Sequence, residues 1–252
     1  MMAYSLCEVH MIRQRQPSIP IRVEVRDRCA VASFKGHKHK FYEDRFRLLT
    51  ASVPFVAARN AGQLYVVADG VGSAPMGANA AQHLCSRIDD FFKGIECSVD
   101  TLQQLLCEIN QEIFSWGLIA GTERPQGACA ASIAWIRENR LCLFHSGDTR
   151  VWLIRDGQCK VISHDHVNDD GHLLRYFGRD GMVCELTEMN MEDGDQLLMS
   201  SDGILSAGVQ LRWLADICGD EGDPDRIARA IAAYAYTRTQ DDVTVLCIDH
   251  AF

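Results

Sequence analysis

Residues 64–77 read LYVVADGVGSAPMG and combine three structural signals in one short segment. Residues 64–68 form an apolar run typical of a buried strand, and Asp69 stands where that run ends. Residues 70–77 are predicted to form a glycine-containing loop. Small and apolar residues then recur at helical spacing over residues 78–92, so a helix should follow. The segment therefore predicts a carboxylate at the end of a buried strand, beside a loop.

Strand and helix patterns continue on both sides of this segment. Residues 21–34 carry β-branched and apolar residues at strand-like intervals, and residues 99–116 place leucines and isoleucines on one helical face. Further strands are predicted at residues 128–136, 141–145, 151–155, 158–162, 185–189, 196–200 and 243–248, with a DG hairpin turn at residues 155–158 and an alanine-rich helix at residues 225–236.

This succession of strands, with a pair of helices inserted, predicts an α+β fold. Consecutive strands favour antiparallel sheets, and the helices should pack outside them. Residues 1–20 resemble an irregular leader. Residues 21–252 contain no internal repeat, low-complexity segment or linker, so a single domain is predicted there.

The composition is that of a globular protein with an acidic balance. The chain has 252 residues, of which 47% are hydrophobic, enough to bury a sizeable core. A formal net charge of -9 argues against a nucleic-acid surface and fits a carboxylate site, although acidity also serves solubility. No stretch approaches the roughly 18 apolar residues of a membrane helix, and the first 20 residues contain no run suited to secretion. Neither nucleic acid nor a membrane is an expected partner.

The cysteines indicate the compartment. There are eleven, an odd number, and none stands in a CxxC pair. Several lie in apolar segments, among them Cys85, Cys107, Cys142 and Cys247. They are predicted to be small buried hydrophobic residues in a reducing cytosol, not a disulfide framework or a zinc site. A cytoplasmic location is expected.

Acidic residues beside strand ends are the main functional signal. Asp69 and Asp202 each follow an apolar strand, and Asp241 stands just before one; the others are Glu43, Asp44 and Asp148. Any one of them is equally well explained as a turn residue. Strand ends can converge, however, and converging carboxylates repel unless cations bind between them. Hard oxygen ligands suit magnesium or manganese, and two such ions roughly 3.5–4 Å apart can activate a bridging water.

Other catalytic systems find little support. The sequence contains no GxSxG elbow, no GxxxxGK[ST] phosphate loop and no HExxH helix. The pairs His37/His39 and His164/His166 are further candidates for metal binding, although close-spaced histidines in polar loops are more often solvated.

Six short motifs resemble those of the metal-dependent protein phosphatases of type 2C (PPM family), in the family's order, over about residues 28–250. They are KFYEDR (residues 40–45), VADGVGS (67–73) with Gly77, GDTR (147–150) with the hairpin after it, the Asp165-His166 pair, DQLLMSSDG (195–203) and DDVTV (241–245). The Gly-Ser-Ala form of the central loop is similar to that of a divergent, mainly bacterial branch.

The resemblance implies a four-layer sandwich, in which two antiparallel sheets are each flanked by a pair of helices. It also implies hydrolysis of phosphoserine and phosphothreonine in proteins by a metal-activated water, with two Mn²⁺ or Mg²⁺ ions per site and a third, looser ion. The expected partner is a phosphorylated protein, opposed by a serine/threonine kinase, and the chain is expected to be a monomer.

Roles for individual residues are also implied by the resemblance. Asp69 would bridge both ions, Asp202 and Asp241 would hold the first, Glu43 and the Gly70 carbonyl would hold the second, and Asp44 would hold its waters. Asp148 would bind the third ion together with Asp202. The residues expected at the reacting phosphate are Asp69, Asp44 and His39.

The chain departs from the family pattern at four points. His39 stands where the family usually has an arginine that grips the phosphate, and Lys38, Lys40 and Arg45 are candidates to compensate. Ser73 replaces a glycine and Asp242 an asparagine. The flap after Asp165 is also short. These departures leave open two alternatives, a catalytically weak pseudophosphatase that binds a phosphorylated partner and an enzyme for small phosphate esters.

Overall fold

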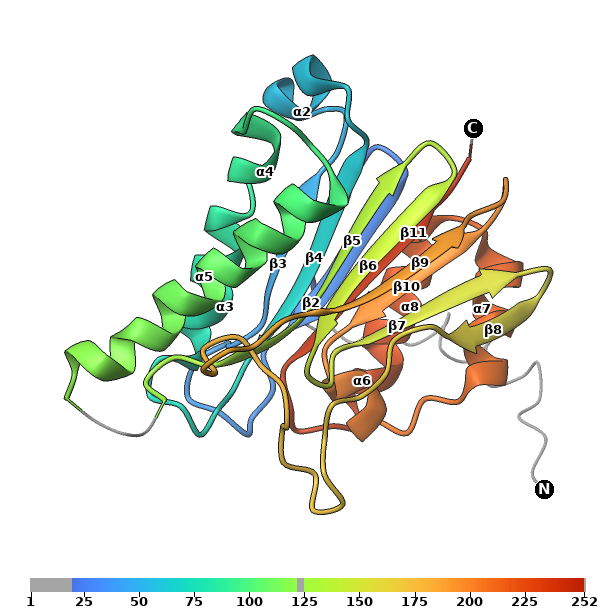
Figure 1. The fold of residues 1–252 in the computed structure, drawn as a ribbon. Helices are drawn as coiled ribbons and strands as arrows, with labels where there is room; N and C mark the ends of the chain where they lie inside the picture. Colours follow the sequence, from blue (N-terminus) through green and yellow to red (C-terminus); the bar gives the residue numbers. More distant parts are fainter. Residues whose placement is uncertain (1–19, 122–124, 252) are drawn as a thin grey trace.

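Residues 20–121 and 125–251 are described by a computed structural model, in which two antiparallel β-sheets pack face to face (Figure 1). The predicted leader, apart from Pro20, lies outside the described residues. The division into leader and domain therefore stays a prediction.

Every strand pairing in both sheets is antiparallel. The first sheet has the order β1 (Arg22–Arg26), β2 (Cys29–Phe34), β11 (Val243–Asp249), β10 (Gln196–Ser200), β7 (Arg150–Arg155) and β8 (Gln158–Val161). The second has the order β3 (Arg45–Leu49), β4 (Gln63–Gly70), β5 (Cys129–Arg137), β6 (Arg140–Ser146) and β9 (Glu185–Asn190).

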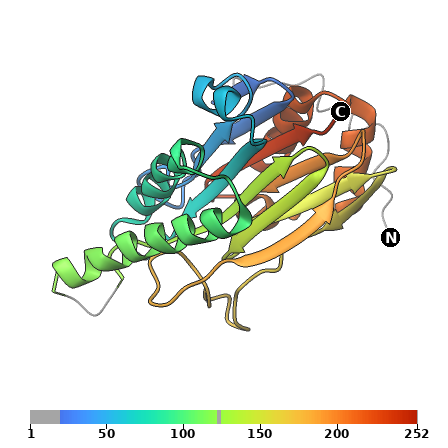
Figure 2. The ribbon, with the colours of Figure 1, turned by 45° about the horizontal axis from the view of Figure 1, so that its top comes forward.

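Helices cover the outer face of each sheet, as Figures 1 and 2 show from two sides. The second sheet is covered by α2 (Pro54–Arg59), α3 (Gly77–Arg87), α4 (Asp90–Lys93) and α5 (Val99–Ile119). The first sheet is covered by α6 (Gly203–Ser206), α7 (Leu211–Glu221) and α8 (Pro224–Tyr236). The expected α+β four-layer sandwich is confirmed, with shorter helices added to the two main pairs.

Strand β4 explains why the central segment is apolar without a break. Leu64, Val66 and Ala68 pack against the helices, whereas Tyr65 and Val67 pack between the two sheets. A strand that is buried on both faces needs apolar residues at every position, so alternation disappears. Asp69 follows the buried run of β4, near the end of the strand, and is itself only half-buried.

The predicted helix over residues 78–92 is two helices in the structure, α3 and α4. Asp89, between them, accepts two hydrogen bonds from the Arg47 guanidinium of β3. The chain turns at this point and both Phe91 and Phe92 become buried.

The sequence patterns did not predict β3, α2, α6 or α7. Strand β3 lies at the edge of its sheet and contains two arginines, which weakened its apolar signal. Helices α2 and α6 are only 6 and 4 residues long. Helix α7 did carry a signal, because its buried Leu214, Ile217 and Cys218 recur at helical spacing.

The cysteines follow the prediction in most cases. Cys85, Cys142 and Cys247 are buried free thiols, whereas Cys107 is half-buried. None of the helices in residues 20–121 and 125–251 is long and apolar enough to cross a membrane.

Candidate metal centre

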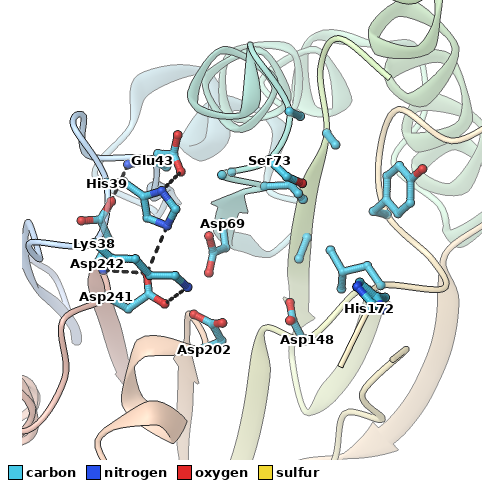
Figure 3. Close-up of a pocket in the computed structure, with 18 of the residues that line it drawn as sticks. Lys38, His39, Glu43, Asp69, Ser73, Asp148, His172, Asp202, Asp241 and Asp242 are labelled. Atoms are coloured by element: carbon cyan, nitrogen blue, oxygen red, sulfur yellow. Dashed lines mark hydrogen bonds and ion pairs between the residues drawn. The ribbon is translucent and has the colours of Figure 1, made fainter. Parts of the chain in front are cut away.

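Strand ends from both sheets converge on one pocket, of about 490 Å³, at one end of the sandwich. Figure 3 shows Asp69, Asp148, Asp202 and Asp241 around it. Asp69 is the last residue but one of β4, Asp148 lies between β6 and β7, Asp202 follows β10, and Asp241 precedes β11. The convergence predicted from the sequence is therefore present, and the acids come from both sheets rather than one.

Most of the predicted site residues line this pocket. They are His39, Glu43, Asp69, Gly70, Asp148, Asp202 and Asp241. Asp44 is the exception, because it is fully buried outside the pocket lining and accepts a 2.6 Å hydrogen bond from the Ser201 hydroxyl. The pocket also contains residues that the sequence patterns did not nominate, including His172, Leu173 and Tyr176 from the short flap.

Two glycines allow these elements to approach one another. A Cβ on Gly70 would lie 2.6–2.8 Å from backbone atoms of Gly77 and Ala78 at the start of α3. A Cβ on Gly203 would lie 2.1 Å from the carbonyl oxygen of Asp242. Glycine at both positions therefore lets α3 pack directly on the end of β4, which carries Asp69, and α6 on the segment that carries Asp241 and Asp242.

The carboxylates destabilise one another's charged forms. Burial, followed by the charges of Asp44 and Asp202, raises the pKa of Asp69 well above its ordinary value. Burial likewise raises the pKa of Asp44 to about 7 and that of Asp148 to about 6. Burial and then the charge of Asp241 raise the pKa of Asp202. Such a cluster favours either protons or bound cations.

The donor set fits a hard divalent cation. Glu43 Oε2 and Asp44 Oδ1 are buried and accept no hydrogen bond from any described residue. A buried carboxylate oxygen without a donor is costly, and a cation removes that cost. Carboxylates together with a backbone carbonyl are ligands that magnesium and manganese prefer. The residues present therefore suit the ions that the resemblance implies.

Asp242 has a positioning role that its sequence place did not reveal. Its two carboxylate oxygens accept hydrogen bonds from the backbone N–H of Gly36, at 2.8 Å, and of Glu43, at 2.7 Å. Asp242 also places a negative charge beside Asp241. The structure directs that charge to two backbone donors, which fixes Glu43 and the loop before Lys38.

Replacing Asp242 with asparagine should lower the free energy of unfolding by about 1–3 kcal/mol, since an amide has one acceptor oxygen for two backbone donors, one of them buried. Urea unfolding of the metal-free protein measures this loss. Asp156→Asn is the matched control, because Asp156 is exposed in the β7–β8 turn at φ 51, a conformation that asparagine also tolerates. Equal stability of the two variants would contradict the role given to Asp242.

The four candidate histidines occupy different environments. His37 is exposed and does not line the pocket. The His39 ring lies between two acids, with Nδ1 3.4 Å from Glu43 Oε2 and Nε2 3.8 Å from Asp241 Oδ1. The pair at residues 164 and 166 lies outside the pocket lining.

His164, His166 and Glu185 form a cluster with metal-ligating atoms within 4.8 Å of one another. His166 Nδ1 accepts a hydrogen bond from the Gly147 N–H, and Nε2 lies 2.7 Å from Glu185. A ring that accepts at Nδ1 and binds a metal at Nε2 would have to lose both protons, so this arrangement disfavours a metal. His166 instead holds Gly147, the residue before Asp148.

Comparison with known proteins identifies one matching family. The sequence model of the Protein phosphatase 2C family matches residues 42–220. No curated protein sequence matches the chain significantly.

Several solved phosphatase structures have the same fold. PppA, a key regulatory component of T6SS in Pseudomonas aeruginosa, has 23% identity and a TM-score of 0.72, with 91% of this chain and 100% of that chain covered. The catalytic domain of the serine/threonine phosphatase PstP, in complex with two manganese ions, has 21% identity and a TM-score of 0.72, with coverage of 92% and 99%. Stp1 from Staphylococcus aureus has 16% identity and a TM-score of 0.77, with coverage of 90% and 96%.

The structural likeness establishes the fold, and the family match extends over more than half of the chain, including the acids from Glu43 to Asp202. The chain belongs to the protein phosphatase 2C (PPM) family.

Proposed function

We propose that this protein is a phosphatase that removes phosphate from phosphoserine and phosphothreonine in other proteins, with two Mn²⁺ or Mg²⁺ ions at the pocket. The observation that carries this proposal is the set of converging carboxylates with raised pKa values. Among them, Glu43 and Asp44 each have a buried oxygen that accepts no hydrogen bond from a described residue. The manganese ions described for PstP support the choice of metal.

The residues divide into ion-holding and positioning groups. Asp202 and Asp241 are proposed to hold one ion, and Glu43 and the Gly70 carbonyl the other. Asp69 lies between Glu43 and Asp202 in Figure 3, where one carboxylate can serve both ions. Asp148 is proposed for a third, looser ion. When bound, such ions supply a nucleophile at neutral pH and neutralise phosphate charge.

Asp44 and His39 are proposed to complete the site. The Ser201 hydroxyl holds Asp44 Oδ2, so Oδ1 stays free to orient water near the ions. The His39 ring lies at the pocket wall between Glu43 and Asp241. From there an imidazole can donate a proton to an oxygen of the substrate.

A pseudophosphatase is the second candidate, and one observation favours it. No arginine lines the pocket in residues 20–121 and 125–251, so the bidentate fork that suits phosphate is missing there. A site of this kind would bind metals and a phosphorylated partner but turn over slowly.

Phosphate release from a phosphoserine or phosphothreonine peptide distinguishes these functions. We expect release with Mn²⁺ or Mg²⁺ and a fall to background after EDTA, because the carboxylates alone repel a phosphate. A phosphotyrosine peptide and p-nitrophenyl phosphate should be poorer substrates. Absence of metal-dependent release would exclude the enzyme. Faster release from p-nitrophenyl phosphate than from phosphopeptides would favour small esters.

A further inference from the structure

Lys38 is the one lysine or arginine among the described residues that line the pocket. The other two cations that could replace the missing arginine lie elsewhere. Lys40 Nζ lies 5.2 Å from the centroid of the Phe41 ring, and Arg45 donates to Gln82 and to the carbonyl oxygen of Asp44. Of the three candidates, only Lys38 can meet a phosphate in the pocket.

The Lys38 ammonium contacts the carboxylate of Asp241, which is also a proposed metal ligand. Its Nζ lies 2.6 Å from Asp241 Oδ2, and the hydrogen bond to Asp241 is the main reason why the Lys38 pKa is raised. The charges of Asp202 and Asp69 act on it in the same direction. An ammonium and a divalent cation repel each other at one carboxylate, so they compete for it.

The backbone of Lys38 is fixed by hydrogen bonds, whereas its side chain is exposed and held only at its ammonium. The backbone N–H groups of His37 and Lys38 both donate to the Gln240 carbonyl, at 2.7 and 2.8 Å. The Lys38 side chain is 54% exposed, so its four-carbon stem has room to reorient. The ammonium can therefore leave Asp241 without displacement of the loop that carries it.

We propose that Lys38 is the phosphate-binding cation of this site, held by Asp241 until metal ions bind and then released to the substrate phosphate. This inference rests on the proposed function and adds a residue to it. In the metal-free protein Lys38 neutralises part of the acidic cluster. Once an ion takes over Asp241, the ammonium stays next to the pocket, where the phosphate oxygens are its new partners.

The proposal predicts opposite shifts in two affinities for Lys38→Met, which keeps the length of the side chain without its charge. Mn²⁺, titrated calorimetrically, should bind about 2- to 5-fold more tightly, since a competing surface ion pair is gone. Inorganic phosphate should bind Mg²⁺-saturated protein about 10- to 100-fold more weakly, since a charge-assisted hydrogen bond is lost. On a phosphopeptide the loss should appear mainly in KM.

Two further variants sharpen the test. Lys40→Met removes a neighbouring charge outside the pocket and should leave both affinities near those of the wild type. Lys38→Arg keeps the charge and should retain phosphate binding. The proposal is overturned if Lys38→Met leaves the affinity for Mn²⁺ or for phosphate unchanged relative to Lys40→Met. Neither titration requires turnover, so an inactive protein that shows both shifts would refute the proposed hydrolysis while supporting the role of Lys38.

Discussion

Asp69→Asn is expected to lower kcat by at least about 100-fold, because even residues that merely orient metal ligands cost 10- to 100-fold when replaced. Asp69 is proposed to serve both ions, and an amide is a weaker, neutral ligand. Initial rates on a phosphopeptide at saturating Mn²⁺ measure the effect. Calorimetric titration should show that Mn²⁺ binding is weakened in parallel.

The same substitution should stabilise the metal-free protein. The pKa of Asp69 is raised in the folded state, so folding favours its protonated form. The wild type therefore loses stability from this group as pH rises from the ordinary carboxyl range through the raised value. Asparagine cannot ionise and avoids that loss. Thermal unfolding should show Asp69→Asn more stable than the wild type above neutral pH, and the difference should vanish in acid.

Asp216→Asn is the matched control, since Asp216 is exposed on α7, outside the pocket lining. It should leave the rate of phosphopeptide hydrolysis and the thermal stability near those of the wild type. A variant Asp69→Asn that retained most of its activity would remove Asp69 from the centre of the proposed mechanism. One that was destabilised at every pH would contradict the electrostatic account of the cluster.

Gly70→Ala is expected to have the second largest effect, a loss of both stability and activity. The added methyl group would lie 2.6–2.8 Å from backbone atoms of Gly77 and Ala78, and no side-chain rotation can relieve that clash. Helix α3 or the end of β4 must shift, which moves Asp69 and the Gly70 carbonyl together. Overpacking of this kind costs about 1–3 kcal/mol, and a displaced site loses activity even where the fold survives.

Gly219→Ala provides the control for this glycine substitution. Gly219 lies in α7, and a Cβ there would meet nothing within 4 Å. Alanine should stabilise that helix by about 0.5–1 kcal/mol, because glycine carries an entropic cost in a helix interior. Chemical unfolding and phosphopeptide hydrolysis compare the two variants. If Gly70→Ala behaved like Gly219→Ala, close packing of α3 on β4 would not be needed for the site.

Local patterns were most reliable where burial on both faces of a strand leaves an unbroken apolar run. The apolar runs of β4, β10 and β11 mark strands buried within the sandwich, and a site acid lies within two residues of one end of each run. The same reasoning missed β3, whose arginines face partners outside its own segment, as Arg47 does toward Asp89. It also joined α3 and α4, because that tertiary contact has no local signature.

The sequence by itself determined the α+β class, most of the strands and the acids near their ends, because apolar runs and side-chain periodicity encode which faces are buried. Only the tertiary structure decided which groups form hydrogen bonds and ion pairs with those acids. Asp242 accepts hydrogen bonds from backbone groups about 200 residues away, and Lys38 reaches Asp241 across 203 positions. Such contacts depend on how loops from different strands are brought together. No local pattern records that placement, which is why Lys38 was one candidate among three until the pocket separated them.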